Sequence, residues 1–127
     1  MNIISSDQIP EPAGHYSPLI EHDGLLYMSG QLPIDPVTKE TPLSIEEQTS
    51  LVLANVERLL HAAGGSRENV LRMRIYISDA EFWGPVNAIY ARFFGDHRPV
   101  RTVVPVQDLH FGCKIEVEVT AVAPDRA

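Results

Sequence analysis

Apolar and polar residues alternate strictly over residues 113–123, which predicts a long, half-buried β-strand. The apolar positions of this segment share one face: Ile115, Val117, Val119 and Ala121. The opposite face carries Lys114, Glu116, Glu118 and Thr120. Residues 70–78 alternate in the same way, so a second strand is expected to direct these side chains to the core: Leu71, Met73, Ile75 and Ile77. Its other face is expected to carry Arg72, Arg74 and Tyr76.

Shorter apolar runs predict the remaining strands. Residues 19–22 and 25–29 flank Asp23-Gly24, a dipeptide that favours a tight hairpin because the turn requires positive φ angles. Residues 101–106 form another apolar run after a loop, and residues 2–5 are apolar enough for a short edge strand.

Two segments with helical spacing separate these strands. Residues 44–63 form the clearest helix, since Ser44 and Glu47 match a capping box and Gly64-Gly65 ends the pattern. A second helix is expected to begin at Pro85, whose fixed φ suits a first helical residue, and to end at Gly95. Its apolar side is expected to comprise Val86, Ile89, Tyr90 and Phe93.

This order of elements predicts an α+β sandwich, in which both helices cover one face of a single mixed sheet. Part of the sheet must be parallel, because a helix that connects two strands returns the chain to the end of the sheet where the first strand began. The chain has 127 residues, so one domain over residues 1–127 is expected. The sheet face without helices still needs a cover, and a partner subunit is the simplest one.

The charge balance argues against nucleic acid as a partner. The formal net charge is −7 and the sequence pI is about 5.1, whereas phosphate backbones are bound by concentrated Lys and Arg. A single cysteine, Cys113, excludes an internal disulfide and suits a reducing compartment. No signal peptide and no apolar run of the ~18 residues that cross a membrane is present, so no membrane partner and a cytoplasmic location are expected.

The sequence contains no metal-binding or nucleotide-binding motif. The five histidines stand apart from one another, without a second ligand at the spacing of a zinc site, which favours surface or loop roles. Gly64-Gly65 follows a helix, whereas phosphate-binding loops precede one. Cys113 is in phase with Ile115 and Val117, which indicates a core thiol rather than a nucleophile. No metal and no cofactor are therefore expected.

Arg101 is the strongest candidate for ligand binding. Its alternate neighbours Val103 and Pro105 are apolar, and a guanidinium on such a face is costly to desolvate unless an anion meets it. Its planar donors suit a substrate carboxylate, at about 1.5–3 kcal/mol per charged hydrogen bond. A structural ion pair with Glu116 or Glu118 explains the residue equally well, and spacing does not decide between the two.

Several short motifs occur in a fixed order along nearly the whole chain. They are Gly14-His15-Tyr16, Ser29-Gly30-Gln31-Leu32-Pro33, Gln48 with Asn55 and Leu59, residues 86–94, Pro99-Val100-Arg101-Thr102 and Ile115-Glu116-Val117. Together they resemble the RidA/YjgF family of imine and enamine deaminases, whose members are also known as L-PSP endoribonuclease-like proteins.

The resemblance implies a chorismate-mutase-like fold and a homotrimer whose sheets surround a central β-barrel. Active clefts are then expected between neighbouring subunits. The implied activity is cofactor-independent hydrolysis of small 2-imino or 2-enamino acids, such as imines derived from 2-aminoacrylate, to 2-keto acids and ammonia.

The resemblance also implies roles for individual residues. Arg101 matches the arginine that binds the substrate carboxylate, and Glu116 matches the glutamate that places or activates the hydrolytic water. Cleft-lining positions are expected at Tyr16, Ser29, Gly30 and Asn87. A solvated strand residue is the alternative for Glu116, and structural roles are the alternative for Tyr16 and Asn87.

Three positions depart from the family pattern. Val103, expected to line the substrate pocket, stands where many members carry cysteine, so the pocket should be more apolar there. Arg74 adds a positive charge near the cleft or the trimer axis, or pairs with an acid. His110-Phe111-Gly112 replaces a loop that usually contains proline. These departures leave the size and identity of the substrate open.

Two alternatives to a general deaminase follow. One is a pathway-specific deaminase of a catabolic enamine, aminomuconate-like or aminoacrylate-like. The other is a non-catalytic protein that binds small keto acids or acts as a chaperone, since relatives are described as translation inhibitors, ribonucleases or holdases. The acidic charge weighs against RNA as the ligand.

Overall fold

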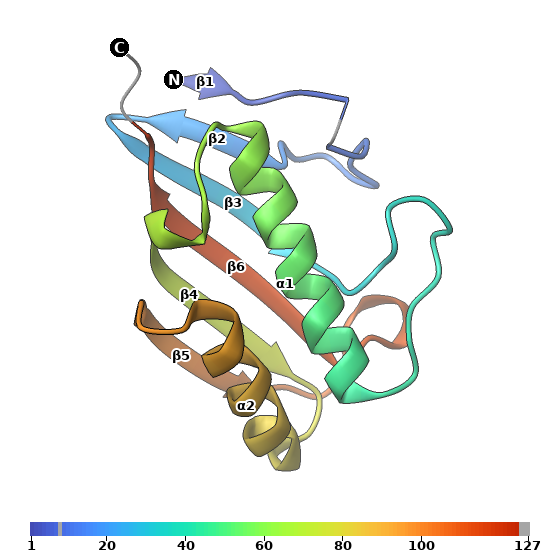
Figure 1. The fold of residues 1–127 in the computed structure, drawn as a ribbon. Helices are drawn as coiled ribbons and strands as arrows, with labels where there is room; N and C mark the ends of the chain where they lie inside the picture. The colour runs from blue at the N-terminus through green and yellow to red at the C-terminus, as the bar shows by residue number, and fades with distance from the viewer. Residues whose placement is uncertain (8, 125–127) are drawn as a thin grey trace.

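The computed structural model describes residues 1–7 and 9–124 as a two-layer α/β structure, in which two helices cover one face of a six-stranded sheet (Figure 1). The strands are β1 (Asn2–Ile3), β2 (Leu19–His22), β3 (Leu25–Gln31), β4 (Val70–Ile77), β5 (Val100–Pro105) and β6 (Ile115–Val122). The helices are α1 (Ile45–Ala62) and α2 (Trp83–Phe94), with 3-10 turns η1 (Arg67–Asn69), η2 (Ala80–Phe82) and η3 (His110–Gly112). The predicted fold class is confirmed.

The sheet has the strand order β1-β2-β3-β6-β4-β5. All its pairs are antiparallel except β4 with β5, which α2 connects as a crossover helix. This is the parallel part that the connecting helix required. β5 is therefore an edge strand, and the alternating strand β6 lies in the interior of the sheet.

The turns and caps follow from local chemistry. Asp23 and Gly24 have φ angles of 50° and 79° and join β2 to β3, as the Asp-Gly signal predicted. The Ser44 hydroxyl accepts a hydrogen bond of 3.0 Å from the Glu47 amide at the start of α1. Gly64, with a φ of 82°, follows the end of this helix.

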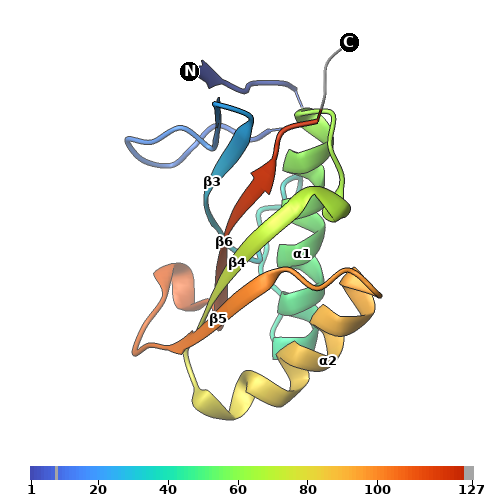
Figure 2. The ribbon, with the colours of Figure 1, turned by 90° about the vertical axis from the view of Figure 1, so that its left-hand side faces the viewer.

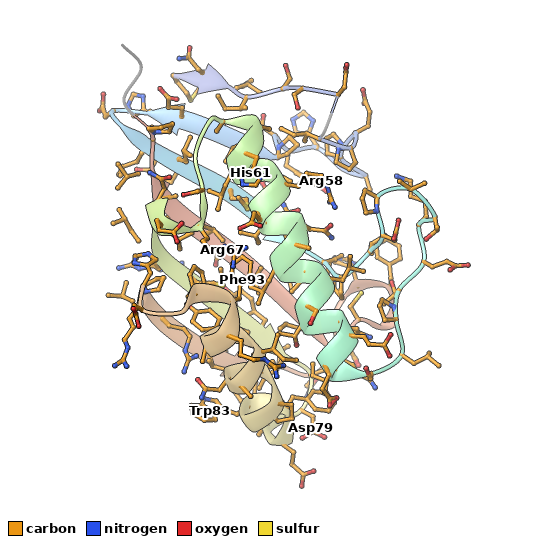
Figure 3. The ribbon with its side chains drawn as sticks, in the orientation of Figure 1. Arg58, His61, Arg67, Asp79, Trp83 and Phe93 are labelled. Atoms are coloured by element: carbon orange, nitrogen blue, oxygen red, sulfur yellow. The ribbon has the colours of Figure 1, made fainter. Side chains whose placement is uncertain are left out.

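Helix α2 ends at Phe94 with Gly95 as its cap, as predicted, but it differs from the prediction at its start and in which phenylalanine it buries. It begins at Trp83 rather than Pro85, and proline is tolerated within the first turn because amides there have no partner inside the helix. Phe94 is buried where Phe93 was expected to be. Phe93 is half-buried, and its ring lies 4.1 Å from the guanidinium carbon of Arg67 (Figure 3).

The prediction for Leu71 is wrong. Its side chain is 45% exposed, whereas Val70 is fully buried. The pairing of β4 with β6 shifts register between Val70 and Arg72, and such a bulge changes which face a residue occupies. The other predicted core residues of β4 are buried as expected.

The two faces of the sheet differ in chemistry. The core lies between the sheet and both helices, and no helix crosses the other face, which we call the open face (Figure 2). The open face carries charged and polar side chains at Arg72, Arg74, Tyr76, Glu116, Glu118 and Thr120, together with apolar ones at Ile20, Leu71, Val100 and Val104. No helix in the described part of the chain is long and apolar enough to cross a membrane.

Candidate active site

Arg101 lies on the helix side of the sheet, against α2. It pairs with the buried Met73 in the parallel register of β4 and β5, and paired residues share a face. Its Nη1 donates a hydrogen bond of 2.9 Å to Oδ1 of Asn87. Its guanidinium carbon lies 4.9 Å from the ring centre of Tyr90 and 5.6 Å from that of Trp83, in the first turn of α2 (Figure 3). We call these residues the Arg101 group.

The Arg101 group has unused capacity to bind an anion. Among residues 1–7 and 9–124, no carboxylate forms an ion pair with Arg101, so the predicted alternative of a pair with Glu116 or Glu118 is not realised within the chain. The guanidinium has five N–H donors, and the neutral Asn87 uses one of them. A cavity beside Arg101 is bordered by Asn87, Tyr90 and Arg98.

Glu116 lies on the open face, in a separate cavity of about 610 Å³. Its lining includes Tyr16, Ser29, Gly30, Tyr76, His110 and Glu118. We call Glu116 and these lining residues the Glu116 group. The Pro- and Gly-rich loop before β2 and the turn η3 both project from the open side of the sheet, away from the helices (Figure 2). Loops from distant parts of the sequence therefore complete this cavity.

The absence of a side chain at Gly30 leaves room for the Glu116 carboxylate. A Cβ at residue 30 would lie 3.0 Å from Oε2 of Glu116, closer than side chains normally approach. Gly30 also lies within the irregular segment of β3, where the pairing with β6 shifts between Met28 and Gln31. The neighbouring Ser29 hydroxyl donates a hydrogen bond of 2.7 Å to the Ser17 carbonyl, which ties the loop of Tyr16 to β3.

Charges around Glu116 act in both directions. Burial raises the pKa of the Glu116 carboxyl; His110 opposes this rise, and the nearby Glu118 adds to it. Glu118 accepts a hydrogen bond of 2.6 Å from the Tyr76 hydroxyl and lies 3.6 Å from Nη1 of Arg74. The bond to Glu118 raises the pKa of Tyr76. Arg74 therefore pairs with an acid, one of the two roles considered for it.

The predicted site residues fall into two sets. The structure brings Tyr16, Ser29 and Gly30 together with Glu116, and it brings Asn87 together with Arg101. The two sets do not meet in one chain, because Arg101 shares a face with Met73 whereas Glu116 pairs with Tyr76 on the opposite face. Val103 lines neither cavity and packs against the core.

Several residues at these cavities were not assigned to the site from the sequence. Tyr76 and Glu118 could have been found, since alternation placed both on the face of Glu116. Trp83 and Tyr90 contact Arg101 from the helix, and no sequence pattern links them to a strand 11 or more positions away. Burial raises the pKa of Tyr90 to about 12, although the charge of Arg101 lowers it.

Neither a metal cluster nor a reactive thiol is found in the described part of the chain. No three His, Cys, Asp or Glu side chains there are grouped to hold an ion. Cys113 is buried, and burial raises the pKa of its thiol, which keeps it protonated at neutral pH. This matches the predicted core thiol.

Comparison with known proteins extends over nearly the whole chain. The family described as Endoribonuclease L-PSP matches residues 6–123. A RutC family protein of Pyrococcus horikoshii is 37% identical over 120 residues, which cover 94% of this chain and 95% of that protein.

Solved structures agree in fold as well as in sequence. RidA from the Antarctic bacterium Psychrobacter superposes with a TM-score of 0.91 at 28% identity, over 96% of this chain and 99% of that one. E. coli TdcF with bound serine gives a TM-score of 0.91 at 31% identity, over 98% of this chain and 100% of that one. The chain therefore belongs to the Endoribonuclease L-PSP family, the RidA/YjgF family that its sequence motifs resemble.

Proposed function

We propose that this protein is a cofactor-independent deaminase, which hydrolyses small 2-imino or 2-enamino acids to 2-keto acids and ammonia. The observation that carries the proposal is the separation of two groups into two open cavities: a guanidinium with no ion-pair partner among the described residues, and a half-buried carboxylate. A 2-imino acid has a negative carboxylate next to an iminium group, and each cavity suits one of these charges.

The Arg101 group is suited to hold the carboxylate. Asn87 and the Tyr90 ring fix the guanidinium at the edge of the sheet and leave most of its donors free. Arginine binds a carboxylate through two parallel hydrogen bonds, which orient the substrate as well as attract it.

Glu116 is suited to act on water. As the water oxygen bonds to the iminium carbon, the carboxylate accepts one of the water protons. The carbinolamine that forms then loses its hydroxyl proton as the C–N bond breaks, and the amine nitrogen gains a proton and leaves as ammonia. An iminium carbon is already electrophilic, so a held carboxylate and a positioned water are sufficient.

The two groups work together only if they come from different subunits. They occupy opposite faces of one sheet, so a substrate of a few atoms cannot reach both within one chain. A homotrimer with clefts between subunits, as the family resemblance implies, would place the edge strand β5 of one copy beside the open face of the next. The relative TdcF binds serine, which carries an amino group and a carboxylate on one carbon.

The direct test generates imines in situ with an amino-acid oxidase and follows keto acid and ammonia. Arg101→Ala should lose most of the rate, and Arg92→Ala removes a charge elsewhere on α2 as the control. Sedimentation checks that the assembly is unchanged. An unchanged rate for Arg101→Ala in an intact assembly contradicts the role of Arg101. A panel that includes dicarboxylic enamines separates the general from the pathway-specific deaminase.

A further inference from the structure

The turn η3 presents His110 to the Glu116 cavity in a fixed geometry. Phe111 and Gly112 have consecutive left-handed φ angles of 60° and 67°, and a non-glycine residue such as Phe111 adopts this region only when its surroundings require it. The Cys113 amide donates a hydrogen bond of 3.1 Å to the His110 carbonyl, and the buried Cys113 anchors the turn to the core. His110 and Phe111 both line the cavity as a result.

The imidazole of His110 has no structural task that would occupy its nitrogens. In the described residues, neither nitrogen has a hydrogen-bond or ion-pair partner, and the one ring contact is with Phe111 at 6.0 Å between ring centres. His97, in contrast, bonds the Val70 carbonyl at 2.7 Å, and His22 lies 3.2 Å from Asp23. His110 is therefore free to act on the cavity.

Within the described residues of one chain, the other positively charged groups near Glu116 have partners of their own. Arg74 and Tyr76 on β4 both interact with Glu118 rather than Glu116. Lys114, two residues before Glu116, donates a hydrogen bond of 2.7 Å to the Leu43 carbonyl. The remaining neighbours are the Tyr16 phenol, from the loop before β2, and the Cys113 thiol at the start of the strand.

We propose that His110 is a positioning residue that acts through Glu116, because its imidazolium keeps the Glu116 side chain in the carboxylate form when the medium becomes acidic. The consequence of this inference for catalysis rests on the proposed function. The effect of His110 on the charge of Glu116 is independent of the proposed function.

The sign of the effect follows from the surroundings. Burial and the Glu118 charge raise the pKa of Glu116, so a falling pH would neutralise this base earlier than an exposed glutamate. A positive charge beside a carboxyl favours its carboxylate form, so a protonated His110 imidazole opposes this loss. It therefore extends the active range of Glu116 to lower pH.

The first measurement is a carbon-13 NMR titration of the glutamate carboxyls in the intact protein, with Glu116→Gln to assign the signal. His110→Gln should move the titration midpoint of Glu116 to higher pH, and His110→Lys should move it back. His61→Gln is the control, because His61 lies on α1 and lines neither the Arg101 nor the Glu116 cavity (Figure 3).

The second measurement is the pH profile of imine hydrolysis. In His110→Gln, kcat/KM near pH ~5.5 relative to pH ~8 should fall several-fold against the wild type, whereas His61→Gln keeps the wild-type ratio. The same Glu116 midpoint in His110→Gln and the wild type would overturn the inference. A shifted midpoint in a protein that hydrolyses no imine supports the role of His110 and contradicts the proposed function instead.

Discussion

The Arg101 group and the Glu116 group are built in different ways. A strand and one helix form the first, in which Asn87 and two aromatic rings hold a guanidinium through neutral contacts. The second is formed by β3, β4, β6, η3 and the loop before β2, and several of its side chains titrate or carry charge. One group is fixed by a packed helix, and the other depends on the mutual influence of charges.

Because the two groups are built differently, substrate affinity should depend on the Arg101 group and the pH dependence of catalysis on the Glu116 group. An arginine remains charged at every pH at which a protein folds, so the Arg101 group should contribute substrate binding that does not vary with pH. The Glu116 group contains the base and the charges that act on it, so the pH dependence of catalysis should arise there. The same contrast gives four predictions.

The largest effect should come from removing Arg101 in one chain and Glu116 in another. Arg101→Ala and Glu116→Gln alone should each lose about 10²-fold or more in rate. A one-to-one mixture, dissociated and reassembled, should regain about a quarter of the wild-type rate, because a quarter of the interfaces join an intact Arg101 to an intact Glu116. Activity is measured before and after mixing. A mixture as inactive as its components would place the whole site within one chain.

Gly30→Ala should damage the Glu116 group alone. The added Cβ would lie 3.0 Å from Oε2 of Glu116 and displace the carboxylate. We expect kcat to fall by about 10-fold with KM nearly unchanged, since the carboxylate must move by a few tenths of an ångström and the rate depends steeply on the position of the base. Steady-state kinetics test this, and Gly84→Ala is the control because a Cβ there meets no atom within 4 Å. A rise in KM with normal kcat would contradict it.

Asn87→Ala should damage the Arg101 group alone. The variant removes the 2.9 Å hydrogen bond that orients the guanidinium, and bonds to charged groups contribute about 1.5–3 kcal/mol. We therefore expect KM to rise about tenfold, with little change in kcat or in the pH profile. A change in the pH profile would show that the two groups are not separable in this way.

Sequence patterns predicted the fold better than the division of the site. Alternation and capping located the interior strand β6 and the helix α1, because both signals act within a few residues. Leu71 was assigned to the wrong face, since a bulge depends on pairing with a distant strand. Arg101 and Glu116 were identified through family motifs, but no motif shows that they lie on opposite faces, which follows from the register of three strands.

The smallest effect is expected for Arg74→Ala. Arg74 and Glu118 lie 3.6 Å apart and are 49% and 38% exposed, and exposed ion pairs contribute about 0–1 kcal/mol. The free energy of unfolding, measured in urea, should change by less than about 1 kcal/mol, and KM should not change. Glu118 keeps its hydrogen bond to Tyr76, so Tyr76→Phe with Arg74→Ala should perturb Glu116 more than either alone. A tenfold rise in KM for Arg74→Ala would instead assign this arginine to the substrate and remove the distinction between a binding group and a proton-transfer group.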